Sequence, residues 1–85
     1  MPADVLDMLR VLLKKQCEHY QVAPKLIASA SDLEAIARYD EPDVPSMHGW
    51  RRELFGQYAL QLKHGQIGLK LKNGEVVFVE LDAKD

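Results

Sequence analysis

A pair of arginines beside a tryptophan is the group of side chains in this sequence best suited to bind a ligand. Trp50, Arg51 and Arg52 follow one another in the string Gly-Trp-Arg-Arg-Glu-Leu-Phe-Gly. Guanidinium groups bind phosphates and an indole ring can stack on a nucleobase, so the three residues suggest nucleic-acid contact. The alternative is that Trp50 packs in the core and the arginines are solvated. Because large aromatic residues at helical spacing usually pack, the spacing alone favours this alternative.

Basic residues are concentrated in one third of the chain. The 85 residues carry a formal net charge of -2, with 11 Lys and Arg against 13 Asp and Glu. Residues 30–45 carry a net charge of -4, and residues 46–74 carry +4. This composition is not that of a disordered or strongly polyanion-binding chain, but a near-neutral protein can still present one basic face. We expect that face to gather the cations of the basic segment, which are Arg51, Arg52, Lys63, Lys70 and Lys72.

No other group of side chains has the spacing of a reactive site. Cys17 and His19 lie two residues apart, which turns them to different sides of a helix, and His48 and His64 complete no zinc pattern. The acidic residues 40–43 lack the glycine and the alternating oxygen ligands of a calcium loop. A glycine-rich phosphate loop is absent, and a chain this short has little room for an enclosed active site. We therefore expect no catalytic residue, metal ligand or cofactor in this chain.

The length of the chain suits one small domain with a single core over residues 1–85. A single cysteine cannot form an internal disulfide, which fits a reducing cytoplasm. No apolar run approaches the roughly 18 residues of a membrane span, and the first residues lack the pattern of a signal peptide. We expect a cytoplasmic protein that has no membrane contact.

Helical periodicity predicts helices over about residues 4–20, 31–39 and 46–64. Ser31 and Glu34 have the spacing of a capping box that would begin the second helix. Gly56 interrupts the third and is expected to mark a bend, and His64-Gly65 predicts a left-handed cap at its end. The first helix has an apolar stripe that is best explained by packing, so that Cys17 is expected to be a buried small hydrophobe. This stripe consists of Val5, Met8, Leu9, Leu12, Leu13, Gln16, Cys17 and Tyr20.

The last part of the chain changes from helical to alternating periodicity. Asn73-Gly74 matches a two-residue type I′ turn and predicts a β-hairpin over about residues 66–81, with Lys72 opposite Glu75. An isolated hairpin is marginal in water, so it must dock on the helices. The expected fold is therefore α+β and mainly α, a small helical domain with a C-terminal β-hairpin. Its inner face would hold Ile67, Leu69, Leu71, Val76 and Phe78, and its outer face Lys70, Lys72, Val77 and Val79.

Three strings, read in order, carry a resemblance to a known family. They are Val-Ala-Pro-Lys-Leu-Ile-Ala-Ser at residues 22–29, Asp-Leu-Glu at 32–34 and Gly-Trp-Arg-Arg-Glu-Leu-Phe-Gly at 49–56. Together they resemble the C-terminal end of bacterial ribonuclease D, a region of the HRDC type (helicase-and-RNase-D C-terminal domain). The resemblance extends from Leu9 to Leu81 and implies an HRDC-like helical body. HRDC domains are usually all helical, so the predicted hairpin departs from that pattern.

The resemblance implies that this chain is an accessory part of a 3′→5′ exoribonuclease acting in tRNA 3′-end processing. The catalytic carboxylates and their divalent metals belong to a separate N-terminal exonuclease domain, so this chain alone is expected to have no enzymatic activity. Its implied partners are that domain in cis and RNA such as tRNA precursors. The implied nucleic-acid-binding residues are Trp50, Arg51, Arg52, Lys63, Lys70 and Lys72.

A second hypothesis makes the chain a structural module. Val77 and Val79 on the outer face of the hairpin, together with an exposed return strand, could pack against the exonuclease domain or form a homo-oligomer.

Overall fold

The computed structural model describes residues 3–81 and confirms a mainly α, α+β fold. Helices α1, α2 and α3 are followed by a 3₁₀ turn, by α4, by a π-helical segment that runs directly into α5, and by the two strands of a hairpin. The helical elements are α1 (Ala3–Tyr20), α2 (Pro24–Ile27), α3 (Ala30–Arg38), the 3₁₀ turn (Pro45–Met47), α4 (Gly49–Arg51), the π-helical segment (Arg52–Gly56) and α5 (Gln57–Lys63). The strands are β1 (Ile67–Lys72) and β2 (Glu75–Glu80).

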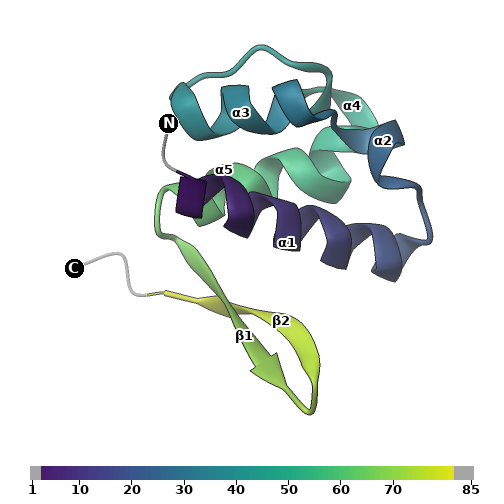
Figure 1. Cartoon of the computed structure of the whole chain (residues 1–85), viewed down its shortest axis with the longest axis vertical. Helices are drawn as coiled ribbons and strands as arrows, with labels where there is room; N and C mark the ends of the chain where they lie inside the picture. The colour runs from purple at the N-terminus through teal and green to yellow at the C-terminus, as the bar shows by residue number, and fades with distance from the viewer. Residues whose placement is uncertain (1–2, 82–85) are drawn as a thin grey trace.

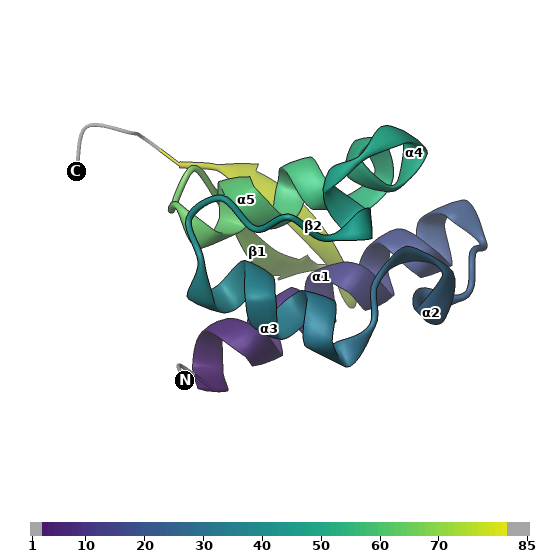
Figure 2. The ribbon, with the colours of Figure 1, turned by 90° about the horizontal axis from the view of Figure 1, so that it is seen from above.

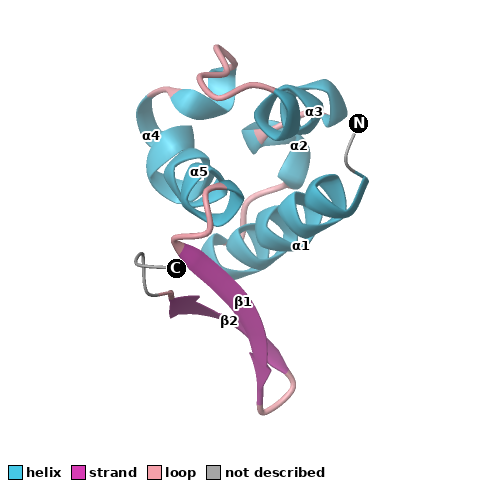
Figure 3. Cartoon of the chain, turned by 90° about the vertical axis from the view of Figure 1, so that its left-hand side faces the viewer, coloured by secondary structure: helices cyan, strands magenta, loops and turns pink. Residues whose placement is uncertain are grey.

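The elements are stacked with α1 and α5 in the middle. Helices α2, α3 and α4 lie on one side of this pair and the hairpin lies on the other, as two perpendicular views show (Figures 1 and 3). The core fills the space between the helices. Its largest fully buried apolar side chains are Leu9, Leu12, Ile27, Ile36 and Phe55.

The apolar stripe of α1 is narrower at its edges than predicted. Met8 and Tyr20 are exposed, and Leu6 is buried although it was not assigned to the stripe. Cys17 and Gln16 are buried as expected. Only one side of α1 is covered by other helices, so residues at the margin of the stripe remain in solvent.

Helix α3 begins at a capping box formed by Ser29 and Asp32, so the prediction of Ser31 and Glu34 is wrong. The Ser29 hydroxyl accepts from the Asp32 amide at 3.2 Å, and the Asp32 carboxylate accepts from the Ser29 amide at 3.1 Å. Ser29 and Asp32 are three residues apart, as are Ser31 and Glu34. Ser29 has the extended backbone of an N-cap residue, whereas Ser31 already lies within the first turn of α3, so the capping box forms at Ser29.

The third predicted helix, over residues 46–64, begins later than expected, because Pro45–Met47 forms a separate 3₁₀ turn and His48 is extended, with φ of -129° and ψ of 144°. From Gly49 to Lys63 the helical elements follow one another without a break and include a π turn at Arg52–Gly56, so Gly56 does not separate them into two bent pieces. The amide of Gln57 donates to the carbonyl of Arg52, five residues back. The predicted left-handed cap is confirmed by φ of 75° at Gly65, whose amide donates to the Leu62 carbonyl at 3.2 Å.

The hairpin has the predicted turn and register. Asn73 and Gly74 have φ of 54° and 81°, and Lys72 lies opposite Glu75. Phe78 docks the inner face by stacking on Tyr58 with ring centroids 5.1 Å apart. The expectation that the whole inner face covers the helices is wrong for Leu71, which is 72% exposed. It is close to the turn, at the end of the hairpin that projects away from the helices (Figure 3).

No helix within residues 3–81 is both long and apolar enough to cross a bilayer.

Candidate nucleic-acid-binding surface

Trp50 lies at the surface, so the interpretation that it packs in the core is wrong. Its side chain is 45% exposed, whereas Phe55 is fully buried. The core prediction extrapolated a regular spacing of three to four residues back from Tyr58. At about 100° per residue a regular helix already places Trp50 about 180° from Ala59, which lies nine residues later and is fully buried, so the spacing from Tyr58 misjudged the buried face.

Arg51 connects α4 to α2. Its Nε donates a hydrogen bond of 2.7 Å to the carbonyl of Leu26, and its Cζ lies over the Trp50 ring at 4.6 Å from the centroid. A guanidinium so placed gains both a cation–π contact and a charge-assisted hydrogen bond. Arg51 therefore fixes the indole of Trp50 and the last turn of α2 relative to each other.

Arg52 is exposed and contacts the 3₁₀ turn. Its Nη1 lies 3.4 Å from the carbonyl oxygen of Met47 and 3.7 Å from the sulfur of the same residue. Within residues 3–81 no carboxylate, including that of the neighbouring Glu53, lies within ion-pair distance of Arg51 or Arg52. Both arginines thus keep a positive charge that no acidic side chain of the described chain offsets.

Sequence reasoning missed two residues of this surface, Lys25 and Leu26. Both lie in α2, Lys25 is exposed, and the Leu26 side chain is 54% exposed. Only the hydrogen bond from Arg51 shows that Leu26, and with it the neighbouring Lys25, lies near the Trp50–Arg51 pair, because some 25 residues separate them in the sequence. Helices α2 and α4 lie at the same end of the helical body (Figures 1 and 2). We call this surface the α2–α4 patch, formed by Lys25, Leu26, Trp50, Arg51 and Arg52.

Lys63 is engaged in holding the end of α3. Its side chain is 13% exposed, and its Nζ donates a hydrogen bond to the carbonyl of Tyr39, the residue that caps α3. The same Nζ lies 3.9 Å from a carboxylate oxygen of Asp40. The ammonium group is therefore turned inward, toward the segment that follows α3.

Lys70 and Lys72 are exposed on β1, on the strand positions that alternate with the inward-facing Ile67 and Leu69. The hairpin and α4 lie on opposite sides of the α1–α5 pair (Figures 1 and 3). The expectation of one basic face made of all five cations is therefore wrong. Three groups replace it: the two arginines, the inward-turned Lys63 and the two hairpin lysines.

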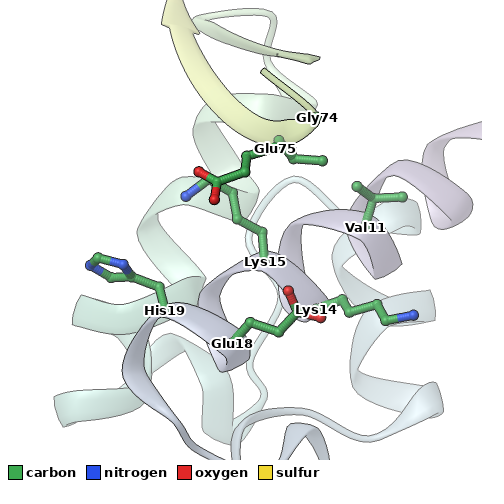
Figure 4. Close-up of a pocket in the computed structure, with 8 residues that line it drawn as sticks. Val11, Lys14, Lys15, Glu18, His19, Gly74 and Glu75 are labelled. Atoms are coloured by element: carbon green, nitrogen blue, oxygen red, sulfur yellow. The ribbon is translucent and has the colours of Figure 1, made fainter. Parts of the chain in front are cut away.

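A groove lies elsewhere, between α1 and the turn of the hairpin. It has a volume of about 500 Å³, and its charged side chains are of both signs. Figure 4 shows Lys15 extending toward the hairpin and Glu75. Lys14, just before Lys15, and Glu18, three residues after it, also come from α1. Lys15 also lies over the Phe78 ring at 4.3 Å from its centroid. The contact of Lys15 with Phe78 helps to dock the hairpin on α1. The mixed charge of the groove favours no particular ligand.

Burial raises the pKa of the Cys17 thiol above its ordinary value. In residues 3–81 no three His, Cys, Asp or Glu side chains cluster as metal ligands would. The fold and the surface together are those of a small, mainly helical protein with an exposed aromatic and cationic patch.

Curated proteins similar to this chain carry the name ribonuclease D. The one from Nitrobacter hamburgensis is 51% identical over 78 residues, which are 92% of this chain and 20% of that protein. Ribonuclease D of Granulibacter bethesdensis is 45% identical over 88% of this chain and 19% of its own length. That of Acidiphilium cryptum is 44% identical over 94% of this chain and 20% of its own length.

The chain thus spans about a fifth of the length of the curated relatives that it matches. The resemblance to ribonuclease D is confirmed, and the share covered is consistent with a C-terminal piece of such a protein. No protein-family model matches the chain, and no solved structure matches it.

Proposed function

We propose that this chain is an accessory region of a ribonuclease D that contacts RNA through the α2–α4 patch and helps to position it for the exonuclease domain. The RNA would be a tRNA precursor, the exonuclease domain would lie in cis and hold the divalent metals, and the protein would act in the cytoplasm. Similarity to ribonuclease D supports the accessory role. The observation that carries RNA contact is the exposed Trp50 stacked on Arg51, beside cations that no carboxylate of residues 3–81 pairs with.

Local charge favours RNA at the patch even though the whole chain is slightly acidic. Phosphate contacts depend on the cations that reach the backbone, and each contact releases counterions. Lys25, Arg51 and Arg52 supply positive charge around one exposed aromatic ring. The two hairpin lysines would contact only RNA long enough to reach the other side of the molecule.

The test is the salt dependence of RNA binding. The chain is titrated with a tRNA-like RNA at several salt concentrations, and the slope of log affinity against log salt is compared between variants. Replacing Lys25 and Arg52 with Gln should reduce the magnitude of the slope by roughly 0.7 to 0.9 per lost phosphate contact. Arg10→Gln with Arg38→Gln is the matched control, because it removes the same charge from α1 and α3.

Lys63 provides a second control. Lys63→Gln should lower the free energy of unfolding, because the Tyr39 carbonyl loses its donor, while the salt slope stays unchanged. The proposal fails if the chain binds no RNA at low salt, or if the control pair reduces the slope as much as the Lys25 and Arg52 pair.

The second candidate function is a packing module, and the hairpin favours it. Its outer face carries the half-buried Val77 and Val79, and Leu71 near its turn is 72% exposed. A surface of this kind often lies against another protein surface. Light scattering of the chain, and of a Val77→Thr, Val79→Thr variant, would distinguish the candidates: self-association that the variant abolishes favours packing, and a monomer in both cases counts against a homo-oligomer.

A further inference from the structure

The indole of Trp50 is a preorganised flat surface. Arg51 lies over the ring at 4.6 Å from its centroid, and its hydrogen bond to the Leu26 carbonyl holds the guanidinium in place. Arg51 lies over one face of the ring, and Trp50 as a residue is 45% exposed. A rigid aromatic ring open to solvent can bind a second flat ring at little cost in conformational entropy.

The surroundings of Trp50 match the parts of one nucleotide. Leu26, a residue that is 54% exposed, adds apolar surface near the Trp50–Arg51 pair, because its carbonyl accepts from Arg51. Lys25, which precedes Leu26 in α2, and Arg52, which follows Arg51, are exposed cations suited to phosphates. The indole itself is neutral and attracts the face of a base rather than a phosphate.

An apolar protein surface fits this patch less well. Covering Trp50 and Leu26 with such a surface would also bury the charges of Arg51 and Arg52. Within residues 3–81 neither arginine has a carboxylate partner, so their desolvation would be uncompensated. A nucleotide brings its own negative charge to the same place.

We infer that the α2–α4 patch is a binding site for one unpaired nucleobase, which stacks on Trp50 while its neighbouring phosphates contact Lys25 and Arg52. This inference rests on the proposed function and narrows it. Inside a duplex each base is covered by its neighbours on both faces, so apart from the two terminal pairs only an unpaired base offers a face to the indole.

Trp50 is the single tryptophan of the chain, so its emission reports directly on the site. The 85-residue chain is titrated with a short single-stranded RNA and with the same sequence annealed to its complement as a blunt duplex, at one low salt concentration. Affinity is measured in parallel by anisotropy of labelled RNA. We expect the single strand to change Trp50 emission in a saturable way, and the blunt duplex, in which only the two terminal pairs offer a face, to change it far less at the same nucleotide concentration.

Substitution of the ring separates stacking from charge. Trp50→Leu keeps an apolar side chain and should weaken single-strand binding about five- to a hundredfold, the range typical of one stacked base. Trp50→Phe keeps a smaller ring and should lose less. Tyr39→Leu is the matched control, because Tyr39 is 55% exposed but lies at the opposite end of the helical body, where α3 ends, and it should have no effect. Circular dichroism verifies that each variant is folded.

Three results would overturn the inference. In the first, single-stranded RNA binds with normal salt dependence but neither changes Trp50 emission nor responds to Trp50→Leu; the proposed function then survives and the base site does not. In the second, the duplex binds as tightly as the single strand and changes Trp50 emission by the same amount. In the third, Trp50 emission changes with protein concentration in the absence of RNA, which assigns the patch to self-association. Failure of both RNAs to bind at low salt refutes the proposed function as well.

Discussion

Replacing Gly56 with Ala tests the packing that supports the α2–α4 patch. A methyl group at Gly56 would lie 2.1 Å from the carbonyl oxygen of Ser46 and 3.3 Å from the terminal methyl of Met47. Carbon atoms in this position essentially never come closer than 3.0 Å to another heavy atom. The 3₁₀ turn at Pro45–Met47 would therefore have to retreat by nearly an ångström. Ser46 and Met47 are both buried, so the retreat disturbs the core.

The expected cost follows from two opposing terms. Overpacking of a close-packed interior costs about 1–3 kcal/mol and sometimes more. Alanine favours helical backbone over glycine by about 1 kcal/mol, which offsets part of that cost. The difference between the two terms is a net loss of about 0–2 kcal/mol of unfolding free energy. Because the obstacle at Gly56 is backbone rather than a flexible side chain, we expect a net loss at the upper end, about 2 kcal/mol. For a domain of this size each kcal/mol lowers Tm by about 4–8 °C.

Urea unfolding followed by circular dichroism measures the loss, and Gly68→Ala is the control. A methyl group at Gly68 would meet only side-chain atoms, of Val79 at 3.3 Å and of Leu81 at 3.5 Å, which can move aside. If Gly56→Ala is as stable as the parent chain, or more stable by the helix-propensity term, the close approach of Gly56 to Ser46 does not exist and this reasoning is refuted.

Two further predictions concern buried polar groups of α1. Gln16→Leu should lower the free energy of unfolding by about 1–3 kcal/mol, because the Gln16 amide donates at 2.5 Å to the carbonyl of Leu54, which would lose this donor; urea unfolding checks this. Burial raises the pKa of Cys17, so on going to alkaline pH the unfolded thiol ionises before the folded one and the free energy of unfolding falls. Cys17→Ala should lose a smaller part of its stability over the same alkaline range, and equal losses in the two proteins would contradict the assignment.

Local signals were sufficient for the hairpin. Asn73 and Gly74 adopt positive φ, and that turn by itself sets the pairing of Lys72 with Glu75. Which part of the inner face is covered is a tertiary question. Leu69 packs on the core while Leu71, two residues later on the same face, lies beyond the helices. Alternation predicts on which face of a strand a residue lies, but not how far along the strand the helices cover that face.

The candidate site depended more strongly on tertiary contacts. The motif containing Trp50 could be singled out from residue types, but its neighbour Leu26 could not, since their proximity depends on the hydrogen bond from Arg51. Charge counting placed Lys63 with the arginines because it cannot distinguish an exposed ammonium from one bonded to the Tyr39 carbonyl. Composition of a segment therefore predicts which charges exist but not the direction in which they point.

A π turn at Arg52–Gly56 adjoins the α2–α4 patch. In a regular α-helix Trp50 lies about 180° around the axis from Ala59, nine residues later and fully buried, so the helix itself turns the ring away from the core. Gln16 donates to the carbonyl of Leu54 within the π turn, and Gly56 allows the 3₁₀ turn to approach it. An exposed tryptophan beside a π turn that two such contacts maintain is better explained by a binding role for that ring than by stability alone.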